Sequence, residues 1–370
     1  MTDGDTPATG EGAYAYRMAL PVEPPLAPML ARLVPAIPEG GFAYEPKWDG
    51  FRCLAFRDGT SVDLRSRHDR PLARYFPELV EAMLAVPGSS FVLDGEIVPA
   101  LPEGFDFAAL MARLHPAESR VVRLRTELPA AYVAFDLLAD ARDSLLPCAD
   151  AERRDRLERL LGGVSGSLSI TPRTLEPGVA RRWLEQATGT GVDGIIAKPL
   201  DGPYEPGRRA MRKVKRGRTA DCVVAGARLL PAGDAVSSLL LALYDESGGL
   251  RHVGVVTSFP AAERRALLAR LAPFVIPLDE HPWRGGFLIG ASPLGRLKGS
   301  AARWTPDMAH DWLPLRPELV AEVAFDQVDV DRFRHPARLV RWRPDREPQS
   351  CTIDQLALPR VALAEALALA

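Results

Sequence analysis

The chain has 370 residues, of which 47% are hydrophobic and 25% charged, and its formal net charge is −2. This composition excludes an intrinsically disordered chain, and no apolar run approaches the ~18 residues of a membrane-spanning helix. Its four cysteines are scattered without a C-x-x-C pair, and the N-terminus lacks the apolar segment of a secretory signal, so we expect neither a zinc site nor disulfides and place the chain in the cytoplasm.

The basic residues are distributed unevenly, with 41 arginines and only five lysines. No block of lysines exists, which argues against a Lys-rich nucleic-acid-coating tail and against a polybasic membrane anchor. Because a guanidinium does not lose its proton, each lysine in such a chain is a candidate for a position that arginine cannot fill. The five are Lys47, Lys198, Lys213, Lys215 and Lys298.

At roughly 100 to 200 residues per domain, the length allows two or three domains. Residues 1–16 are expected to form a flexible tail, and residues 17–218 a domain that mixes strands and helices. The apolar runs at 91–98 and 130–138 predict two of its strands.

Two helices are predicted in the later part of this domain. The leucine spacing in residues 150–161 predicts one, with Asp150 as its N-cap. The other is predicted over residues 177–188, which have a proline in the first turn.

After residue 219 the pattern changes to strands. Apolar runs predict strands at 221–230, 237–245, 250–259 and 319–328. Residues 246–249 predict a hairpin turn, and residues 261–271 a helix. Several strands and one helix within residues 219–356 favour an OB-fold β-barrel, and residues 357–370 are expected to be a helical C-terminal tail.

Two stretches of the chain are strongly basic despite the near-neutral total. Residues 203–218 hold seven basic residues against one acid, and residues 331–346 hold six against two. Contact with a polyanion is therefore compatible with the low net charge. Two solvated surface faces would produce the same pattern.

The sharpest local feature is the segment from Tyr44 to Arg52, which contains Lys47, Asp49 and Gly50. A lysine beside an acid and a glycine that permits a turn can act as an amine nucleophile once it has lost its proton. Arg52, Arg67 or a bound divalent ion would promote that loss by disfavouring the ammonium form. The alternative is an ordinary exposed lysine in a turn.

The residues around Lys47 resemble the adenylation motif of the covalent nucleotidyltransferases, the superfamily of DNA ligases, RNA ligases and mRNA capping enzymes. Later segments match the further motifs of that superfamily in the same order: Ser66-Arg67, Asp94-Gly95-Glu96, Phe135-Asp136, residues 193–198, Lys213-Val214-Lys215 and residues 343–346.

From about residue 21 to residue 356 the chain resembles the short bacterial accessory ATP-dependent DNA ligases of the C type. The resemblance implies an α+β fold, with an ATP-grasp-like nucleotidyltransferase (adenylation) domain followed by a C-terminal OB-fold domain. Two residues depart from the family pattern. Asp193 stands where Glu is usual, one methylene shorter, and Arg346 stands where the last motif usually ends in Lys.

The resemblance implies that Lys47 attacks the α-phosphorus of ATP. It implies ATP contacts for Glu45, Arg52, Arg67, Glu96, Phe135, Lys198, Arg209, Lys213, Lys215, Arg343 and Arg346. Phe135 would stack on the adenine, although a core aromatic is the alternative, and Arg208 is an alternative to Arg209. Glu96 and Asp193 are implied to bind Mg²⁺, with Mn²⁺ as a second choice, and Asp49 and Asp345 to support the site.

The implied activity is the sealing of nicks in double-stranded DNA through a lysyl-AMP and a DNA-adenylate, in DNA repair and recombination in the bacterial cytosol and nucleoid. A monomer without membrane contact is expected, with a separate gap-filling polymerase or other repair proteins as partners. The alternatives are an RNA ligase, another covalent nucleotidyltransferase, or a non-catalytic OB-fold protein that binds nucleic acid.

Overall fold

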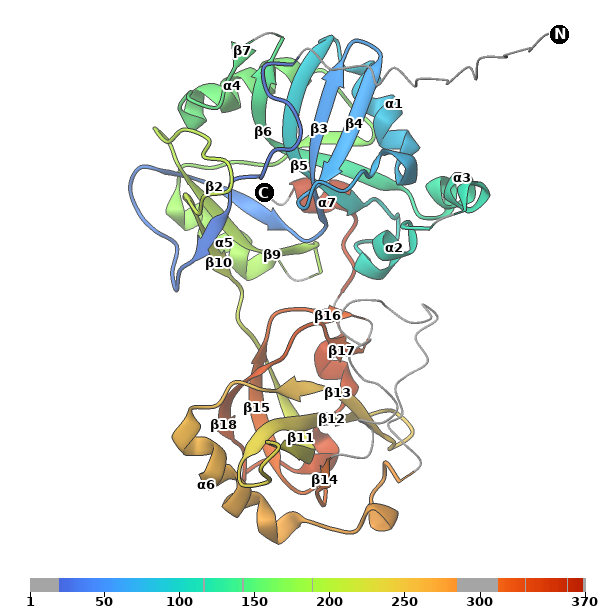
Figure 1. Cartoon of the computed structure of the whole chain (residues 1–370), viewed down its shortest axis with the longest axis vertical. Coiled ribbons are helices and arrows are strands. Elements are labelled where there is room, and N and C mark those ends of the chain that lie inside the picture. Colours follow the sequence, from blue (N-terminus) through green and yellow to red (C-terminus); the bar gives the residue numbers. More distant parts are fainter. Residues whose placement is uncertain are drawn as a thin grey trace, which may run out of the picture.

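The computed structural model describes residues 20–368, except residues 116, 142, 188, 285–311, 330 and 358. Two lobes follow one another along the chain and meet at a narrow waist (Figure 1). The predicted tail at residues 1–16 and Lys298 lie outside the described residues. Within the described ranges, no helix is long and apolar enough to cross a membrane.

The first lobe contains two β-sheets. The larger has the strand order β4-β3-β5-β6-β7 with β8 paired to β6, and the smaller has the order β1-β10-β9-β2. The larger sheet is formed by β3 (Phe51–Asp58), β4 (Ser61–Ser66), β5 (Ser90–Pro99), β6 (Ala130–Asp140), β7 (Asp143–Ser144) and β8 (Leu168–Ile170). The smaller sheet is formed by β1 (Ala31–Leu33), β2 (Phe42–Trp48), β9 (Val192–Pro199) and β10 (Met211–Lys215).

Five helices accompany these sheets. They are α1 (Pro77–Ala85), α2 (Phe107–Ala112), α3 (Glu118–Glu127), α4 (Asp150–Leu161) and α5 (Pro177–Gln186). Leu79 of α1 and Leu157 of α4 are fully buried in one cluster with residues of the larger sheet. The central strands β5 and β6 are buried along nearly their whole length, which explains why they appear in the sequence as continuous apolar runs.

The predicted helix at residues 150–161 is confirmed, but its predicted N-cap is wrong. Ala149 occupies the cap position, and Asp150 is the first residue of α4. The carboxylate of Asp150 lies instead against Arg153 and Arg173, at 3.5 and 2.7 Å. Buried ion pairs have replaced the local capping interaction. The other helix, α5, ends two residues before its predicted end.

The second lobe is a β-barrel with the OB-fold that was predicted. Its strands are β11 (Arg218–Leu229), β12 (Val236–Tyr244), β13 (Leu250–Val256), β14 (Leu313–Pro314), β15 (Val320–Phe325) and β18 (Arg338–Trp342), with a hairpin of β16 (Val328–Asp329) and β17 (Arg332–Phe333). They pair in the order β13-β12-β11-β15-β18, and a parallel bridge from Val256 to Ala337 links the two edges. Helix α6 (Ala261–Leu271) occupies its predicted residues.

The lobes are joined by two stretches of chain. Only residues 216 and 217 separate β10 in the first lobe from β11 in the second. The chain leaves the second lobe after Leu356, which is buried in that lobe's core. It then returns to the first lobe, where α7 (Leu363–Ala368) lies near β5 (Figure 1).

Candidate active site

A cavity of about 300 Å³ in the first lobe is lined by residues from both sheets. Leu30, Ile196 and Met211 give it an apolar wall, while charged side chains gather around the rest of it. An apolar wall with convergent charged groups is typical of small-ligand sites. Nine of the predicted site residues line the cavity: Glu45, Lys47, Arg52, Arg67, Glu96, Phe135, Lys198, Arg209 and Lys213.

Lys47 and Asp193 are brought together by the pairing of β2 with β9. The backbone of Lys47 pairs with Gly194, and the register shifts between Lys47 and Trp48. The Nζ atom of Lys47 lies 2.6 Å from Oδ1 of Asp193. Gly194 allows β10 to come close as well, because a Cβ there would lie 2.2 Å from the carbonyl oxygen of Val214.

The charge state of Lys47 is controlled by acids. Burial favours its neutral amine, but the Asp193 carboxylate, with Glu96 and Asp49, outweighs burial and raises the pKa of Lys47. Lys47 is therefore an ammonium group at neutral pH in the ligand-free protein. The expectation that neighbouring arginines promote proton loss from Lys47 is wrong for this state, because its closest charged partner is an acid.

Glu96 lies on β5 beside Lys47. Its Oε1 accepts a hydrogen bond from the backbone N–H of Gly50 at 3.0 Å. A Cβ on Gly50 would lie 2.1 Å from the carbonyl oxygen of Ile97, so close packing requires the glycine here. Burial raises the pKa of Glu96 to about 8, despite Lys47 and Arg52. A carboxyl that keeps its proton at neutral pH can both donate and accept hydrogen bonds.

This raised pKa predicts how stability depends on pH. Between the ordinary glutamate pKa and about 8, the unfolded chain loses the Glu96 proton while the folded chain keeps it, so the free energy of unfolding falls as pH rises, by at most about 1.4 kcal/mol per pH unit. Glu96→Gln lacks this contribution. In urea unfolding of the ligand-free protein from about pH 5 to about pH 8, the stability of Glu96→Gln relative to the original protein should increase with pH. A difference that stays constant would contradict the buried, protonated carboxyl.

Arg52 is held by an acid that was not among the predicted site residues. Its Nε and Nη2 donate to the two carboxylate oxygens of Asp94 at 3.0 and 2.6 Å, and Asp94 is fully buried. The hydroxyl of Tyr204 donates to the same carboxylate at 2.7 Å and accepts from the backbone N–H of Met29 at 2.9 Å. These contacts fix the direction in which Arg52 enters the cavity. The signals in the sequence were an acid within the apolar run 91–98 and the place of this acid in the motif Asp94-Gly95-Glu96.

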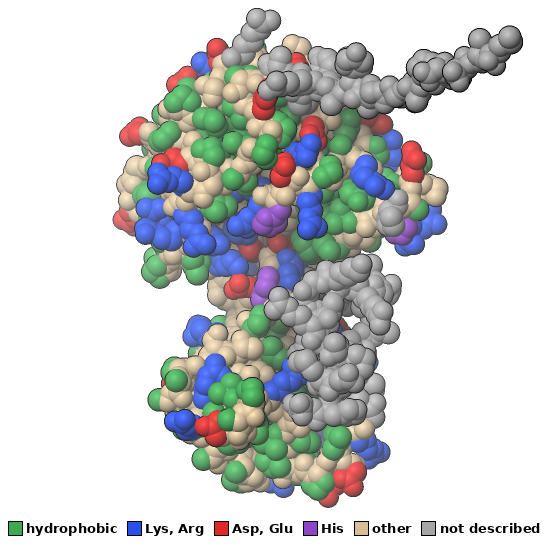
Figure 2. All heavy atoms as spheres, viewed as in Figure 1, with side chains coloured by type: hydrophobic (Ala, Val, Ile, Leu, Met, Phe, Trp, Pro, Cys, Tyr) green, Lys and Arg blue, Asp and Glu red, His purple; other side chains and the backbone are tan. Residues whose placement is uncertain are grey.

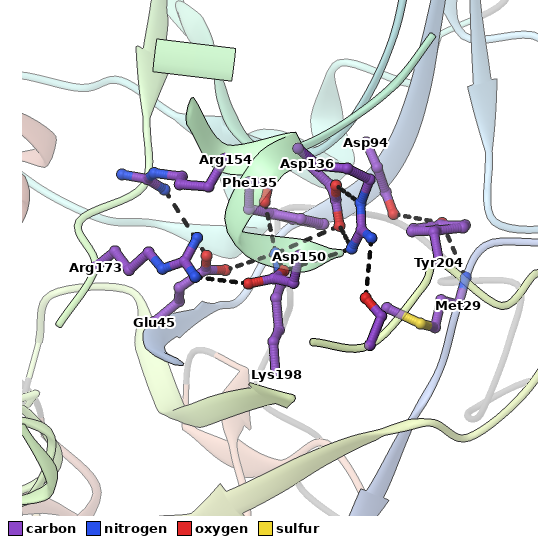
Figure 3. A network of polar contacts seen from close by, with 12 residues as sticks. Met29, Glu45, Asp94, Phe135, Asp136, Asp150, Arg154, Arg173, Lys198 and Tyr204 are labelled. Atoms are coloured by element: carbon purple, nitrogen blue, oxygen red, sulfur yellow. Dashed lines mark hydrogen bonds and ion pairs between the residues drawn. The ribbon is translucent and has the colours of Figure 1, made fainter. Parts of the chain in front are cut away.

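Lys198 is buried within a network of charged side chains (Figure 3). Its Nζ donates to the carbonyl oxygen of Phe135 at 2.5 Å and lies 3.0 Å from Oε2 of Glu45. Asp136 and Asp150 lie 3.6 and 4.0 Å from the same atom. Lys198 thus holds the wall of the cavity through Glu45 and Phe135, and its charge is already paired.

Arginines complete this network from the side of α4. Arg153 is buried and contacts both carboxylate oxygens of Asp136, at 2.7 and 3.1 Å. Burial would raise the pKa of Asp136, but Lys198 and Arg153 outweigh it and lower that pKa. Removing one partner of a buried ion pair typically costs about 3–5 kcal/mol, so these residues fix the wall firmly.

Phe135 and Glu45 at this wall can still make contacts with a ligand. The guanidinium of Arg52 and the Nζ atom of Lys198 lie 5.2 and 5.3 Å from the centroid of the Phe135 ring. Glu45 is 2% exposed, and among the described residues its Oε1 accepts no hydrogen bond. A buried carboxylate oxygen without a donor is costly, so a ligand that brings an N–H group to Glu45 would satisfy it.

Cationic side chains surround the opposite part of the cavity. Arg67 and Arg209 are exposed and line it, whereas Arg208 is not among the lining residues. Burial and the ammonium groups of Lys47 and Lys215 lower the pKa of Lys213. Figure 2 shows Lys and Arg side chains along the lower edge of the upper lobe, beside the waist. This arrangement favours a polyanionic ligand.

The second lobe contacts the carboxylates beside Lys47. Arg334 donates from Nη1 to both oxygens of Asp49 at 3.1 Å. Gln327 donates to Oδ2 of Asp193 at 3.2 Å, and Lys215 lies 2.7 Å from Asp326. Neither Arg334 nor Gln327 was predicted, because only the placement of the lobes brings them to the site.

The predicted residues at the end of the second lobe are not at the cavity. Arg343 contacts both carboxylate oxygens of Asp221 at 2.9 Å and also pairs with Asp345. Arg346 lies 3.6 Å from Asp221. The described residues that line the cavity all belong to the first lobe, so this structure separates Arg343, Asp345 and Arg346 from the other predicted residues.

The carboxylates near Lys47 fit a metal ion that shares its ligands with a substrate. Among the described residues, no group of three or more His, Cys, Asp or Glu side chains forms a metal cage. Mg²⁺ commonly uses only one or two carboxylates together with phosphate oxygens and water. Asp193 and Glu96 suit that role, because the side chains of both lie close to Lys47.

Family models match most of the chain. One described as an ATP dependent DNA ligase domain matches residues 28–215, and one described as an ATP dependent DNA ligase C terminal region matches residues 232–346. The chain is 50% identical to DNA ligase C2 of Mycolicibacterium smegmatis, over 92% of this chain and 97% of that protein. It is 48% identical to DNA ligase C of Mycobacterium tuberculosis, over 92% of this chain and 96% of that protein.

Solved structures share the fold. The structure called Pmar-Lig_PreS3 has a TM-score of 0.53 at 16% sequence identity, covering 85% of this chain and 68% of that chain. At this identity the likeness bears on the fold alone.

Proposed function

The chain belongs to the ATP-dependent DNA ligases, and on that premise we propose that it seals 5′-phosphate/3′-hydroxyl nicks in duplex DNA with Lys47 as its nucleophile. The observation that carries this proposal is the position of Lys47. Its Nζ atom stands beside Asp193 at a cavity that has an apolar wall on one part and cations on another.

The proposed reaction has three steps. The neutral Nζ of Lys47 attacks the α-phosphorus of ATP, the bond to the β-phosphate oxygen breaks, and pyrophosphate leaves. An oxygen of the 5′-phosphate of the nick then attacks the phosphorus of the lysyl-AMP, the P–N bond breaks, and Lys47 leaves as the amine. Finally the 3′-hydroxyl attacks that 5′-phosphate, AMP leaves, and the strand is joined.

The first step requires Lys47 to lose its proton. In the ligand-free protein the carboxylate of Asp193 keeps Lys47 charged. A Mg²⁺ ion held by Asp193 and phosphate oxygens would offset that carboxylate and stabilise the charge that develops on the phosphates, and Mn²⁺ would serve in the same way. Lys213, Lys215, Arg67 and Arg209 would bind the phosphates of ATP and of the nick.

The base and ribose are proposed to lie against the buried wall. Phe135 would stack on the adenine. Oε1 of Glu45, which accepts no hydrogen bond within the described part of the chain, would accept one from the adenine amino group. Guanine presents a carbonyl oxygen where adenine has that amino group, so Glu45 favours ATP over GTP. Glu96 would contact the ribose hydroxyls or the metal, and Arg52 a phosphate or the DNA end.

The second lobe is proposed to take two positions. In the first step it would bring Arg343, Asp345 and Arg346 to the pyrophosphate, and it would then swing back to hold the DNA. We further propose that the protein acts as a monomer in bacterial DNA repair and recombination, in the cytosol and nucleoid. A separate gap-filling polymerase and other repair proteins would supply the nick.

Single-turnover assays test this function. With labelled ATP and Mg²⁺ the protein should acquire one AMP, detected by intact mass, and GTP should give little adduct. The adduct should then seal a nicked DNA duplex much faster than a nicked RNA duplex. A preference for GTP would point to capping chemistry, and a preference for RNA would point to an RNA ligase. Absence of any adduct would leave only a nucleic-acid-binding protein.

A further inference from the structure

The C-terminal segment of the chain is anchored on the lobe that carries Lys47. We define the C-terminal strap as residues 359–368. Val361 donates its backbone N–H to the carbonyl oxygen of Gly189 at 3.0 Å and accepts from the backbone N–H of Phe105 at 3.1 Å. Arg360 also pairs with Asp106 at 3.1 Å.

Helix α7 of the strap is packed directly behind the nucleophile strand. Ala366 is 4% exposed and belongs to one buried cluster with Trp48, Val98 and Val133. Trp48 is the neighbour of Lys47 in the chain. The strap therefore contacts the first lobe at the end of β2 that carries the reactive lysine.

The first lobe has glycines where the strap approaches. A Cβ on Gly189 would lie 1.9 Å from the carbonyl oxygen of Pro359, and a Cβ on Gly104 would lie 2.5 Å from the carbonyl carbon of Arg360. Both glycines also have positive φ angles, of 82° and 105°. The docking position is therefore built into loops of the first lobe that lie far apart in sequence.

The docked strap restricts the second lobe to a small range of positions. Leu356 is part of the core of the second lobe, and Pro359 already touches Gly189 of the first. Three residue steps span at most about 11 Å. While the strap is docked, the second lobe is consequently held at two points, at residues 216–217 and near Leu356.

This restriction keeps Arg343 away from the cavity. Arg343 donates its backbone N–H to Val320, which pairs with Val223, whereas Arg218 at the start of β11 pairs with Phe325. Val223 is five residues beyond Arg218, a distance of about 16 Å along a strand. Arg343 thus lies about halfway along β11 from the waist, and the barrel has to rotate before Arg343 can reach the cavity.

We propose that the C-terminal strap is a second tether between the lobes, which must leave its dock before lysine adenylation and which, when docked, holds the arrangement used for DNA. This inference rests on the proposed function of Arg343 and Arg346 in the first step. The docked arrangement is the one in which Arg334 contacts Asp49 and Gln327 contacts Asp193. Pro359 and Arg360 line the same cavity between the lobes as these two carboxylates.

Two full-length variants test the tether in opposite directions. Ala366→Glu places a charge in the buried contact and should release the strap, whereas Ala364→Glu places it on an exposed position of the same helix and is the matched control. With the strap released, adenylation should be at least as fast as in the control. Sealing of a pre-adenylated nick should be about tenfold slower, because the equilibrium between the two lobe positions shifts.

The second variant locks the strap with a disulfide between Phe105→Cys and Val361→Cys, whose backbones are hydrogen bonded. Oxidised, it should lose at least about tenfold in adenylation, keep sealing a pre-adenylated nick, and recover adenylation on reduction. Full adenylation by the oxidised protein would overturn the tether, as would equal behaviour of Ala366→Glu and Ala364→Glu in both steps. If Ala366→Glu does not fold, the lock decides alone. A failure of the proposed function would instead appear as no AMP adduct on the unmodified protein.

Discussion

Replacing Lys47 with alanine should abolish the AMP adduct, lowering the rate of adenylation by at least about 10³-fold. No other described lysine lies in a position equivalent to that of Lys47. Lys198 is buried among acids, and Lys215 is paired with Asp326. Lys213 lines the cavity, but it lies on β10 and its neighbours are mostly cations. Intact mass after incubation with ATP and Mg²⁺ measures the loss directly.

Two controls separate loss of the nucleophile from loss of the fold. Lys47→Arg keeps a positive charge beside Asp193 and should fold normally, but its guanidinium does not become a free amine, so it should also form no adduct. A nick that already carries AMP bypasses the first step, and both variants should seal it at a measurable rate. An adduct that persists at the original level in Lys47→Ala would remove Lys47 from the mechanism.

Much of the fold and part of the site could be predicted because short patterns determine them. The apolar runs at 91–98 and 130–138 became the buried strands β5 and β6. The segment around Lys47 combined residue types that nucleophilic chemistry needs, and the pairing of β2 with β9 placed it beside Asp193. In each case neighbours in sequence, or a motif with a chemical reason, carried the information.

The remaining features depend on packing between distant parts of the chain. The contact of Arg334 with Asp49 joins residues of different lobes, and the anchoring of Arg52 by Asp94 required the register of β3 against β5. The position of the C-terminal strap depends on hydrogen bonds from loops in two separate regions of the first lobe. The wrong prediction of Asp150 as the N-cap has the same origin, because its carboxylate forms ion pairs with Arg173 and Lys198, which are distant in sequence.

The roles of Asp193 can be separated by changing its charge and its length. Asp193→Asn removes a carboxylate that keeps Lys47 protonated and that we propose as a metal ligand. The loss of a preorganised charged group should lower the maximal rate of adenylation about 10²-fold. At the same time the pKa of Lys47 should fall, because the acid that contributes most to raising it is gone. The rise of adenylation with pH should therefore begin at a lower pH than in the original protein.

Asp193→Glu is the matched variant, because the resemblance places Glu at this position in related enzymes. It keeps the charge and adds one methylene, so it should adenylate within about tenfold of the original rate and keep the original pH dependence. The measurement is the single-turnover rate of AMP transfer at saturating ATP and Mg²⁺ across pH. If Asp193→Asn kept the full maximal rate, Asp193 would not bind the metal. If the pH dependence did not move, Asp193 would not control the proton on Lys47, although the two side chains lie 2.6 Å apart. Because the two outcomes are independent, one set of pH profiles assigns each role separately.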